Sequence, residues 1–262
     1  MIVFVVMWVA YGAYLQAPSI ARQVGRETME KYYSLYVSSW FMYATIVSLA
    51  SSCVTLVSSI YYHVSSIPYL IRFGNLSLWR YILSLYAGAI ILSLILGGIM
   101  VLLTSLLFSY NGLGVEVHPQ LASIAALPGA ISVVGLFIAS LSLFLSLLST
   151  KILRLSSTRM ISFVPLVIAM FSYFVYLLLD YRDPLVIYVN PFASSMLLAG
   201  EAYYGSELPV SYMVSFSSSE IEKAHPIYLI SSTLIWSIAL TIANMLLIRK
   251  LYIVKIEEER VL

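Results

Sequence analysis

Long uncharged segments dominate this chain. Six stretches contain no Asp, Glu, Lys or Arg, namely 1–21, 32–71, 81–115, 117–150, 160–179 and 224–248. A helix needs about 20 predominantly apolar residues to cross the hydrocarbon core of a bilayer, because each residue adds about 1.5 Å. A charged residue at the centre of such a helix costs roughly 2.5–3.5 kcal/mol on insertion scales. The sequence therefore predicts an all-α polytopic membrane protein.

The composition excludes several other classes of protein. The chain of 262 residues is 61% hydrophobic and 10% charged, with a mean hydropathy of +0.95, whereas a soluble domain is about 25% charged. This balance excludes a water-soluble enzyme and a disordered chain, and it favours a single domain, 1–262. The 14 Lys and Arg residues are dispersed over several connections, so we expect no nucleic-acid partner. Cys53 is the only cysteine, so we expect no internal disulfide and no thiol metal cluster.

Six transmembrane helices are expected. They lie at about 1–17, 36–62, 82–109, 129–149, 161–180 and 227–248. We read 1–17 as a genuine first span, with a truncated start as the alternative.

The charges of the connections indicate an orientation. If the N-terminus is inside, the inner pieces 63–81, 150–160 and 249–262 hold nine Lys and Arg residues, and the outer pieces hold five. This asymmetry follows the positive-inside rule and predicts an N-in, C-in topology. Acidic residues gather in the last outer connection, 181–226. They include Glu201, Glu207, Glu220 and Glu222.

Hydroxyl residues recur along the second predicted span at offsets that place them on one helix face. They are Ser48, Ser51, Ser52, Thr55, Ser58 and Ser59. One interpretation is a packing face, because small residues let helices approach closely and hydroxyls can bond their own backbone. The other interpretation is a mildly polar wall of a conduit. Small-residue stripes are common where membrane helices meet, which favours packing.

The connection 63–81 is short and unusually apolar for a solvated loop. It mixes large apolar side chains with two arginines, and we select six of its residues as candidates for partner docking. These are Leu70, Arg72, Phe73, Leu76, Trp79 and Arg80. One interpretation is an interfacial helix lying on the lipid surface. The other is a coupling helix that inserts an apolar knob into a cytoplasmic partner.

The connection 181–226 is long enough to contain structure of its own. Its uncharged part, 184–200, is interrupted by Asn190 and Pro191. Proline at a first helical position can open a short helix, and Gly200 or Gly205 can close it. We therefore expect an outer re-entrant or interfacial helical hairpin, because a seventh crossing would put the two termini on opposite sides.

No catalytic motif accompanies these features. The sequence contains no GxxxxGK[ST] motif and no HExxH motif, which removes the usual phosphate-binding loop and a common zinc site. The one acidic residue within a predicted span is Asp180, at the very end of 161–180, so the mid-membrane acid that proton-coupled transporters usually require is lacking. We expect no catalytic residues, no metal ligands and no cofactor in this chain, so its driving force would come from another subunit.

The order of these features resembles the membrane subunit of type-two ATP-binding-cassette (ABC) exporters. Ile67-Pro-Tyr-Leu-Ile-Arg-Phe-Gly-Asn-Leu-Ser-Leu-Trp-Arg-Tyr81 is similar to the coupling helix of that family and its entry into the third span. Asn190-Pro-Phe-Ala-Ser-Ser-Met-Leu-Leu-Ala-Gly200 is similar to its outer helical hairpin. The family usually begins with a cytoplasmic amphipathic elbow helix, whereas this chain begins with apolar residues.

The resemblance implies a permease subunit of an exporter in the cell membrane, without an ATPase site of its own. Its partners would be an ABC ATPase subunit, which binds ATP and Mg, and a second permease copy or a paralogue. The alternative is a non-transporting anchor or scaffold in which 181–226, rather than 67–80, carries partner binding. A stand-alone secondary carrier is disfavoured because coupling acids and broken spans are lacking.

Overall fold

The computed structural model describes residues 2–24, 26–64, 73–74, 77–111, 113, 121–153, 159–178, 184–210 and 222–260. The elements in these ranges are helices: α1 (Ile2–Tyr11), η1 (Gly12–Gln16), α2 (Ala17–Val24), α3 (Arg26–Val64), α5 (Leu78–Ser109), α6 (Leu121–Leu147), η2 (Leu148–Ile152), α7 (Arg159–Leu178), α8 (Pro184–Val189), α9 (Pro191–Tyr204) and α10 (Pro226–Arg260). Strand-like pairing in these ranges is limited to one isolated bridge, between Pro209 and Lys223.

Six helical segments in the described ranges are long and apolar enough to cross a membrane. They are Val3–Gln23, Tyr32–Tyr61, Trp79–Ser109, Ala125–Thr150, Met160–Leu178 and Pro226–Ile248. The predictions of an all-helical fold and of six helices long and apolar enough to cross a membrane are therefore confirmed for the described residues. Helices α3 and α10 extend beyond the predicted spans, because bilayer thickness limits the apolar window but not the backbone hydrogen bonding of a helix.

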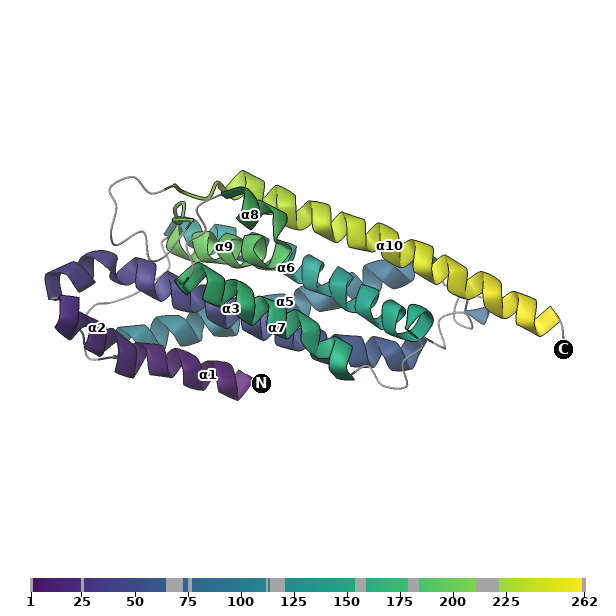
Figure 1. Cartoon of the computed structure of the whole chain (residues 1–262), viewed down its shortest axis with the longest axis horizontal. Helices are drawn as coiled ribbons and strands as arrows, with labels where there is room; N and C mark the ends of the chain where they lie inside the picture. Colours follow the sequence, from purple (N-terminus) through teal and green to yellow (C-terminus); the bar gives the residue numbers. More distant parts are fainter. Residues whose placement is uncertain are drawn as a thin grey trace.

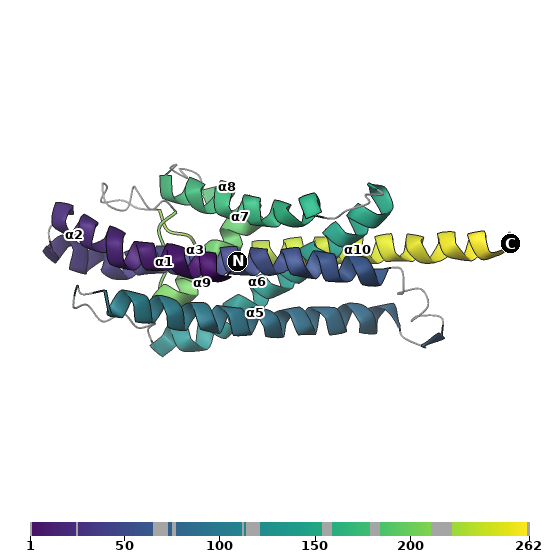
Figure 2. The same cartoon turned by 90° about the horizontal axis from the view of Figure 1, so that it is seen from below.

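The long helices lie side by side and alternate in direction (Figures 1 and 2). The C-terminal ends of α3, α6 and α10 lie at one end of the bundle, together with the N-terminal ends of α5 and α7 (Figure 1). Helices α8 and α9 lie at the opposite end. The outer faces of α5 and α7 expose large apolar side chains, as expected of surfaces that face lipid. These include Leu83, Ile95, Leu102, Val167 and Phe171.

The first membrane-crossing segment contains a π turn, η1, which brings it close to α3. Built on Gly12, a Cβ atom would lie 2.3 Å from Cε2 of Trp40, so only glycine fits there without displacing the ring. The Tyr36 hydroxyl donates to the Gly12 carbonyl at 3.0 Å. The backbone N–H of Ala17 donates to the same carbonyl oxygen. The helical run continues to Val24, past the predicted end at residue 17.

Helix α6 begins earlier than the predicted fourth span, which starts at residue 129. It includes Pro128 within its length, where a proline removes one backbone hydrogen bond. Membrane helices tolerate such breaks when nearby groups satisfy the backbone. The Ser132 hydroxyl donates to the Pro128 carbonyl at 2.7 Å, although it does not replace the missing N–H.

Polar side chains join the helices at several depths. Buried Asn244 of α10 donates through Nδ2 to the Ser140 carbonyl of α6 at 2.9 Å. The Ser146 hydroxyl of α6 donates to the Val57 carbonyl of α3 at 3.0 Å. Because lipid supplies no hydrogen-bonding partners, contacts of this kind each add a modest amount to helix association.

Candidate functional site

The predicted docking segment lies partly within the described residues. Leu70, Arg72 and Leu76 lie outside them. Phe73 is 75% exposed and Trp79 is 54% exposed.

Arg80 is also exposed, and its backbone N–H donates to the Ser77 hydroxyl at 3.3 Å. Ser77 is the N-cap of α5. The first turn of α5, which begins at Leu78, therefore presents the Trp79 ring and the Arg80 guanidinium away from the bundle core.

The hydroxyl stripe of α3 occupies several environments. Ser48 is buried, Thr55 and Ser59 are exposed, and the other three members are half-buried. All three half-buried hydroxyls bond within α3. Ser51 donates to the Ser48 carbonyl, Ser52 to the Leu49 carbonyl and Ser58 to the Val54 carbonyl. Both assigned roles, packing face and conduit wall, therefore stay predictions.

Cys53, next to the stripe, contacts α6 directly. It accepts a hydrogen bond from the Ser142 hydroxyl at 2.9 Å. Cys53 is buried and forms no disulfide.

Helix α9 is defined by the residues at its two ends. Asn190 is the N-cap, and its side-chain oxygen accepts from the backbone N–H groups of Phe192 and Ala193. Pro191 occupies the first helical position, where its missing N–H costs nothing. Gly205 ends the helix with φ = 83°, a left-handed conformation that favours glycine. The sequence named Pro191 as the start and Gly205 as one of two candidate ends.

Helix α9 is buried in the bundle although it is shorter than the six membrane-crossing segments. All its side chains from Phe192 to Tyr203 are buried, and it contacts α3, α6, α7 and α10. The Ser194 hydroxyl donates to the Ile187 carbonyl of α8 at 2.7 Å, and it also reaches the Ser232 hydroxyl of α10 at 3.1 Å. The Ser194 hydroxyl of α9 therefore finds its partners on the neighbouring helices α8 and α10 rather than in water.

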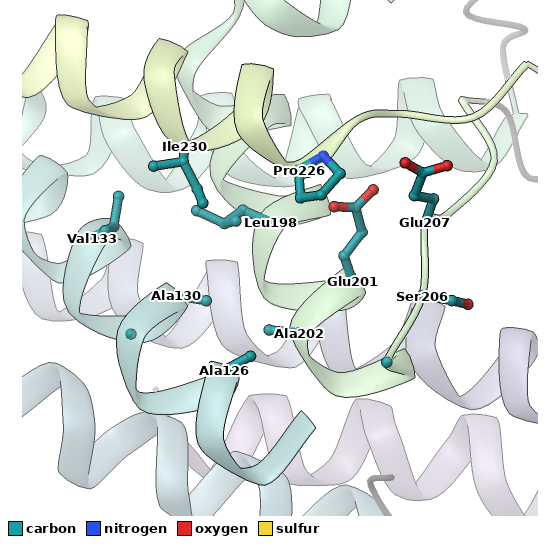
Figure 3. Close-up of a pocket in the computed structure, with 12 residues that line it drawn as sticks. Ala126, Ala130, Val133, Leu198, Glu201, Ala202, Ser206, Glu207, Pro226 and Ile230 are labelled. Atoms are coloured by element: carbon teal, nitrogen blue, oxygen red, sulfur yellow. The ribbon is translucent and has the colours of Figure 1, made fainter. Parts of the chain in front are cut away.

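A pocket of about 550 Å³ lies where α6, α9 and the beginning of α10 meet (Figure 3). This volume lies within the range of about 300–1,000 Å³ that is typical of small-molecule sites. Its apolar lining includes Ala130 and Val133 of α6, Leu198 of α9 and Ile230 of α10. The carboxyl groups of Glu201 and Glu207 lie at the opposite side of the pocket from Val133 and Ile230 (Figure 3).

Glu201 is the least expected residue of this pocket. It is only 6% exposed, and its Oε1 accepts the backbone N–H of Leu208 at 3.3 Å. Its Oε2 is buried and has no hydrogen-bond partner among the described residues. Burial raises the pKa of Glu201 to about 8; the Leu208 N–H lowers it and the nearby Glu207 carboxylate raises it. Glu201 is therefore largely protonated at neutral pH when the pocket holds no cation.

Glu207 forms a more solvated rim to the pocket. Its Oε1 lies 3.9 Å from Nε2 of His225, and both side chains are nearly half exposed. The backbones on either side of this pair are joined, because the Ala224 N–H donates to the Leu208 carbonyl at 2.9 Å. The Tyr176 hydroxyl of α7 donates to the Pro209 carbonyl at 3.2 Å. The short pairing around Pro209 therefore holds the carboxyl side of the pocket against the bundle.

Sequence reasoning did not identify this pocket. From the sequence, Glu201 and Glu207 were considered only as two of the acidic residues in the connection 181–226. A usable signal was present, because Glu201 directly follows an uncharged stretch and precedes the closing Gly205 by one helical turn. That position places a carboxyl group on a helix whose other residues are apolar enough to be buried.

Comparisons with protein-family models, curated proteins and solved structures find no match for the chain. Within the described ranges, no three His, Cys, Asp or Glu side chains are grouped so that they could hold a metal ion.

Proposed function

We propose that this chain is the permease subunit of an ABC-type exporter, which moves a substrate across the cell membrane while separate ATPase subunits hydrolyse ATP. The observation that carries the proposal is the exposure of Trp79 and Arg80 at the start of α5. An exposed aromatic ring next to an arginine has the composition that protein interfaces use most effectively.

The arrangement of the bundle supports this proposal. The start of α5 lies at the same end as the ends of α3 and α6 and the C-terminal end of α10, while α8 and α9 lie at the other (Figure 1). The inner connections of the N-in, C-in topology would then share one side of the membrane. A single cytoplasmic partner could reach all of them there, and α8 and α9 would form the outer hairpin.

The proposed mechanism is mechanical. The first turn of α5 would dock on an ATPase, which binds ATP and Mg, with Trp79 in an apolar groove and Arg80 paired with an acidic residue. Helix α5 begins at Leu78 and continues without a break to Ser109, so a displacement of its docked end would move the whole helix. Two permease subunits would in this way open and close a conduit between them.

Co-purification tests the docking step. A tagged chain isolated from its native membranes should retain an ATPase subunit and Mg-dependent ATP hydrolysis. The double substitution Trp79→Ala and Arg80→Glu should weaken ATPase binding by about thirty-fold, because truncation of one central aromatic anchor typically costs 2 kcal/mol or more. The matched control is Tyr110→Ala, which removes an exposed ring from the opposite end of α5.

Two results would contradict the proposal. One is the absence of any ATPase from the purified wild-type chain. The other is equal ATPase retention by the double variant and the Tyr110→Ala control.

A membrane scaffold is the second candidate, favoured by the apolar side chains that α8 exposes at Val186 and Val189. In that case Val186→Asp with Val189→Asp would release the bound partner, and the Trp79 and Arg80 substitutions would not. Deleting the whole hairpin cannot separate the two functions, because the buried α9 is part of the core.

A further inference from the structure

The pocket between α6, α9 and α10 combines features that rarely occur together in a membrane bundle. It has an apolar lining, sufficient volume for a small molecule, and a carboxyl group that is 6% exposed with one unpartnered oxygen. A buried polar atom without a partner costs free energy. Because Glu201 lines the pocket, a ligand bound there can supply a hydrogen-bond donor to the ionised form of this carboxyl group.

The chemistry of the walls selects the class of ligand. Glu201 lies in the last turn of α9, where the helix dipole disfavours negative charge and favours a cation. Glu207 adds a second carboxylate at the same side of the pocket. A bare metal ion would need more oxygen ligands than these two side chains provide, whereas an ammonium group needs only hydrogen-bond acceptors and a compensating charge.

The position of the pocket along the helices matches an amphiphilic molecule. Two membrane-crossing segments begin at Ala125 and Pro226, and Ala126 and Pro226 both line the pocket. The carboxyl groups lie beside Pro226, whereas Val133 and Ile230 lie further along the two segments (Figure 3). The pocket thus runs from a polar rim into an apolar interior, as the charged and apolar parts of such a molecule require.

We propose that this pocket binds a hydrophobic ammonium compound, with the ammonium group on the carboxyl group of Glu201 and the apolar part between Val133, Leu198 and Ile230. Glu207 stabilises the charge from the rim. The site belongs to the isolated chain and does not depend on an ATPase or on transport.

Binding also moves a proton. The carboxyl group of Glu201 is neutral below its raised pKa of about 8, and an ammonium ion binds its charged form. The proton on Glu201 is therefore released to solvent when the ligand enters. Affinity consequently rises from about pH 6 to about pH 8, while an alkylammonium keeps its charge throughout this range. Glu207 and His225 are titratable side chains at this rim, and Tyr176 of α7 also interacts electrostatically with Glu201.

The probe is adamantan-1-ammonium, and adamantan-1-ol is its uncharged analogue of nearly equal size. Equilibrium dialysis measures both with the purified chain in lipid nanodiscs, after subtraction of binding to empty nanodiscs. We expect the wild-type chain to bind the ammonium at least ten-fold more tightly than the alcohol at about pH 8, in line with charge-assisted hydrogen bonds.

Three variants locate the binding to the pocket. Glu201→Gln keeps the shape of the side chain and removes its charge, so the preference for ammonium should fall to less than about three-fold. Ala126→Leu adds volume at the exposed edge of the pocket and should weaken both compounds. Glu222→Gln removes an exposed acid that does not line the pocket and should change neither.

Equal wild-type affinities for the ammonium and the alcohol would overturn the proposal. So would an ammonium preference that survives Glu201→Gln, or one that Ala126→Leu leaves unchanged. If Glu201→Gln does not fold, the wild-type comparison and Ala126→Leu still decide the matter. Failure here leaves the proposed ATPase docking untouched, because that test uses other residues at the other end of the bundle.

Discussion

Glu201 is an ionisable residue in a helix whose other buried side chains are uncharged. The residues of α9 from Phe192 to Gly200 are uncharged and buried, and a carboxylate in that environment would be strongly destabilising. Protonation removes most of this cost, which is why the pKa of Glu201 rises to about 8. This raised pKa makes stability depend on pH, because the unfolded chain releases the Glu201 proton near pH 4.5, whereas the folded chain keeps it up to about pH 8.

The stability of the folded chain should therefore fall as pH rises from about 4.5 to about 8, and then level off. Between these values the folded state retains the Glu201 proton that the unfolded state has lost. In the Glu201→Gln variant this part of the pH dependence should disappear, and the variant should be more stable than wild type at about pH 9. Thermal unfolding in detergent, followed by tryptophan fluorescence from pH 5 to pH 9, measures both curves. Parallel curves for the two proteins would contradict the assigned pKa.

At the scale of the elements, close helix contacts depend on a few small residues. Gly97 of α5 faces Ile131 of α6, and Gly135 of α6 faces Ser93 of α5. Gly12 in η1 lies against the Trp40 ring, and a buried indole ring cannot yield as a flexible side chain can. The π turn and the glycine together fix the approach of the first segment to α3.

Gly12→Ala should destabilise the chain by about 1–3 kcal/mol, the usual cost of overpacking a filled contact. The matched control is Gly98→Ala in α5, where an added Cβ meets no atom within 4 Å. That substitution should be neutral or stabilising by up to about 1 kcal/mol, because alanine is the better helix former. Unfolding of the detergent-solubilised chain by titration with SDS gives both values. Similar losses for the two variants would mean that Trp40 moves aside.

Hydropathy predicted the number of membrane-crossing helices but not their internal detail. The apolar windows gave six segments because the bilayer imposes a minimum length. The π turn at Gly12 and the early start of α6 before Pro128 were missed, since both depend on tertiary contacts and not on local propensity. The boundaries of α9 could be predicted from the sequence, because Asn190, Pro191 and Gly205 favour helix ends by their own chemistry. The pocket could not be predicted in this way, because it forms only where α6 packs against α9 and α10, which lie far from α6 in the sequence.

At the scale of the whole molecule, the proposed orientation can be tested with single cysteines. The native Cys53 is buried, so the unmodified chain serves as the blank. Gly74→Cys places a thiol at the proposed inner side and Glu222→Cys at the proposed outer side, and both native residues are exposed. A membrane-impermeant maleimide should label Glu222→Cys in intact cells, and Gly74→Cys only after permeabilisation. The reverse pattern would invert the topology and remove the basis for ATPase docking at the start of α5.

The length of α10 has a consequence for how distant regions influence each other. It runs unbroken from Pro226 to Arg260, about 50 Å at 1.5 Å per residue, and its first residues line the pocket. A tilt of about 5° around one end would carry the other end through roughly 4–5 Å, nearly the pitch of one helical turn. A displacement of the C-terminal end of α10 would thus reach the pocket through one rigid helix. No chain of intermediate side chains would be needed to transmit it.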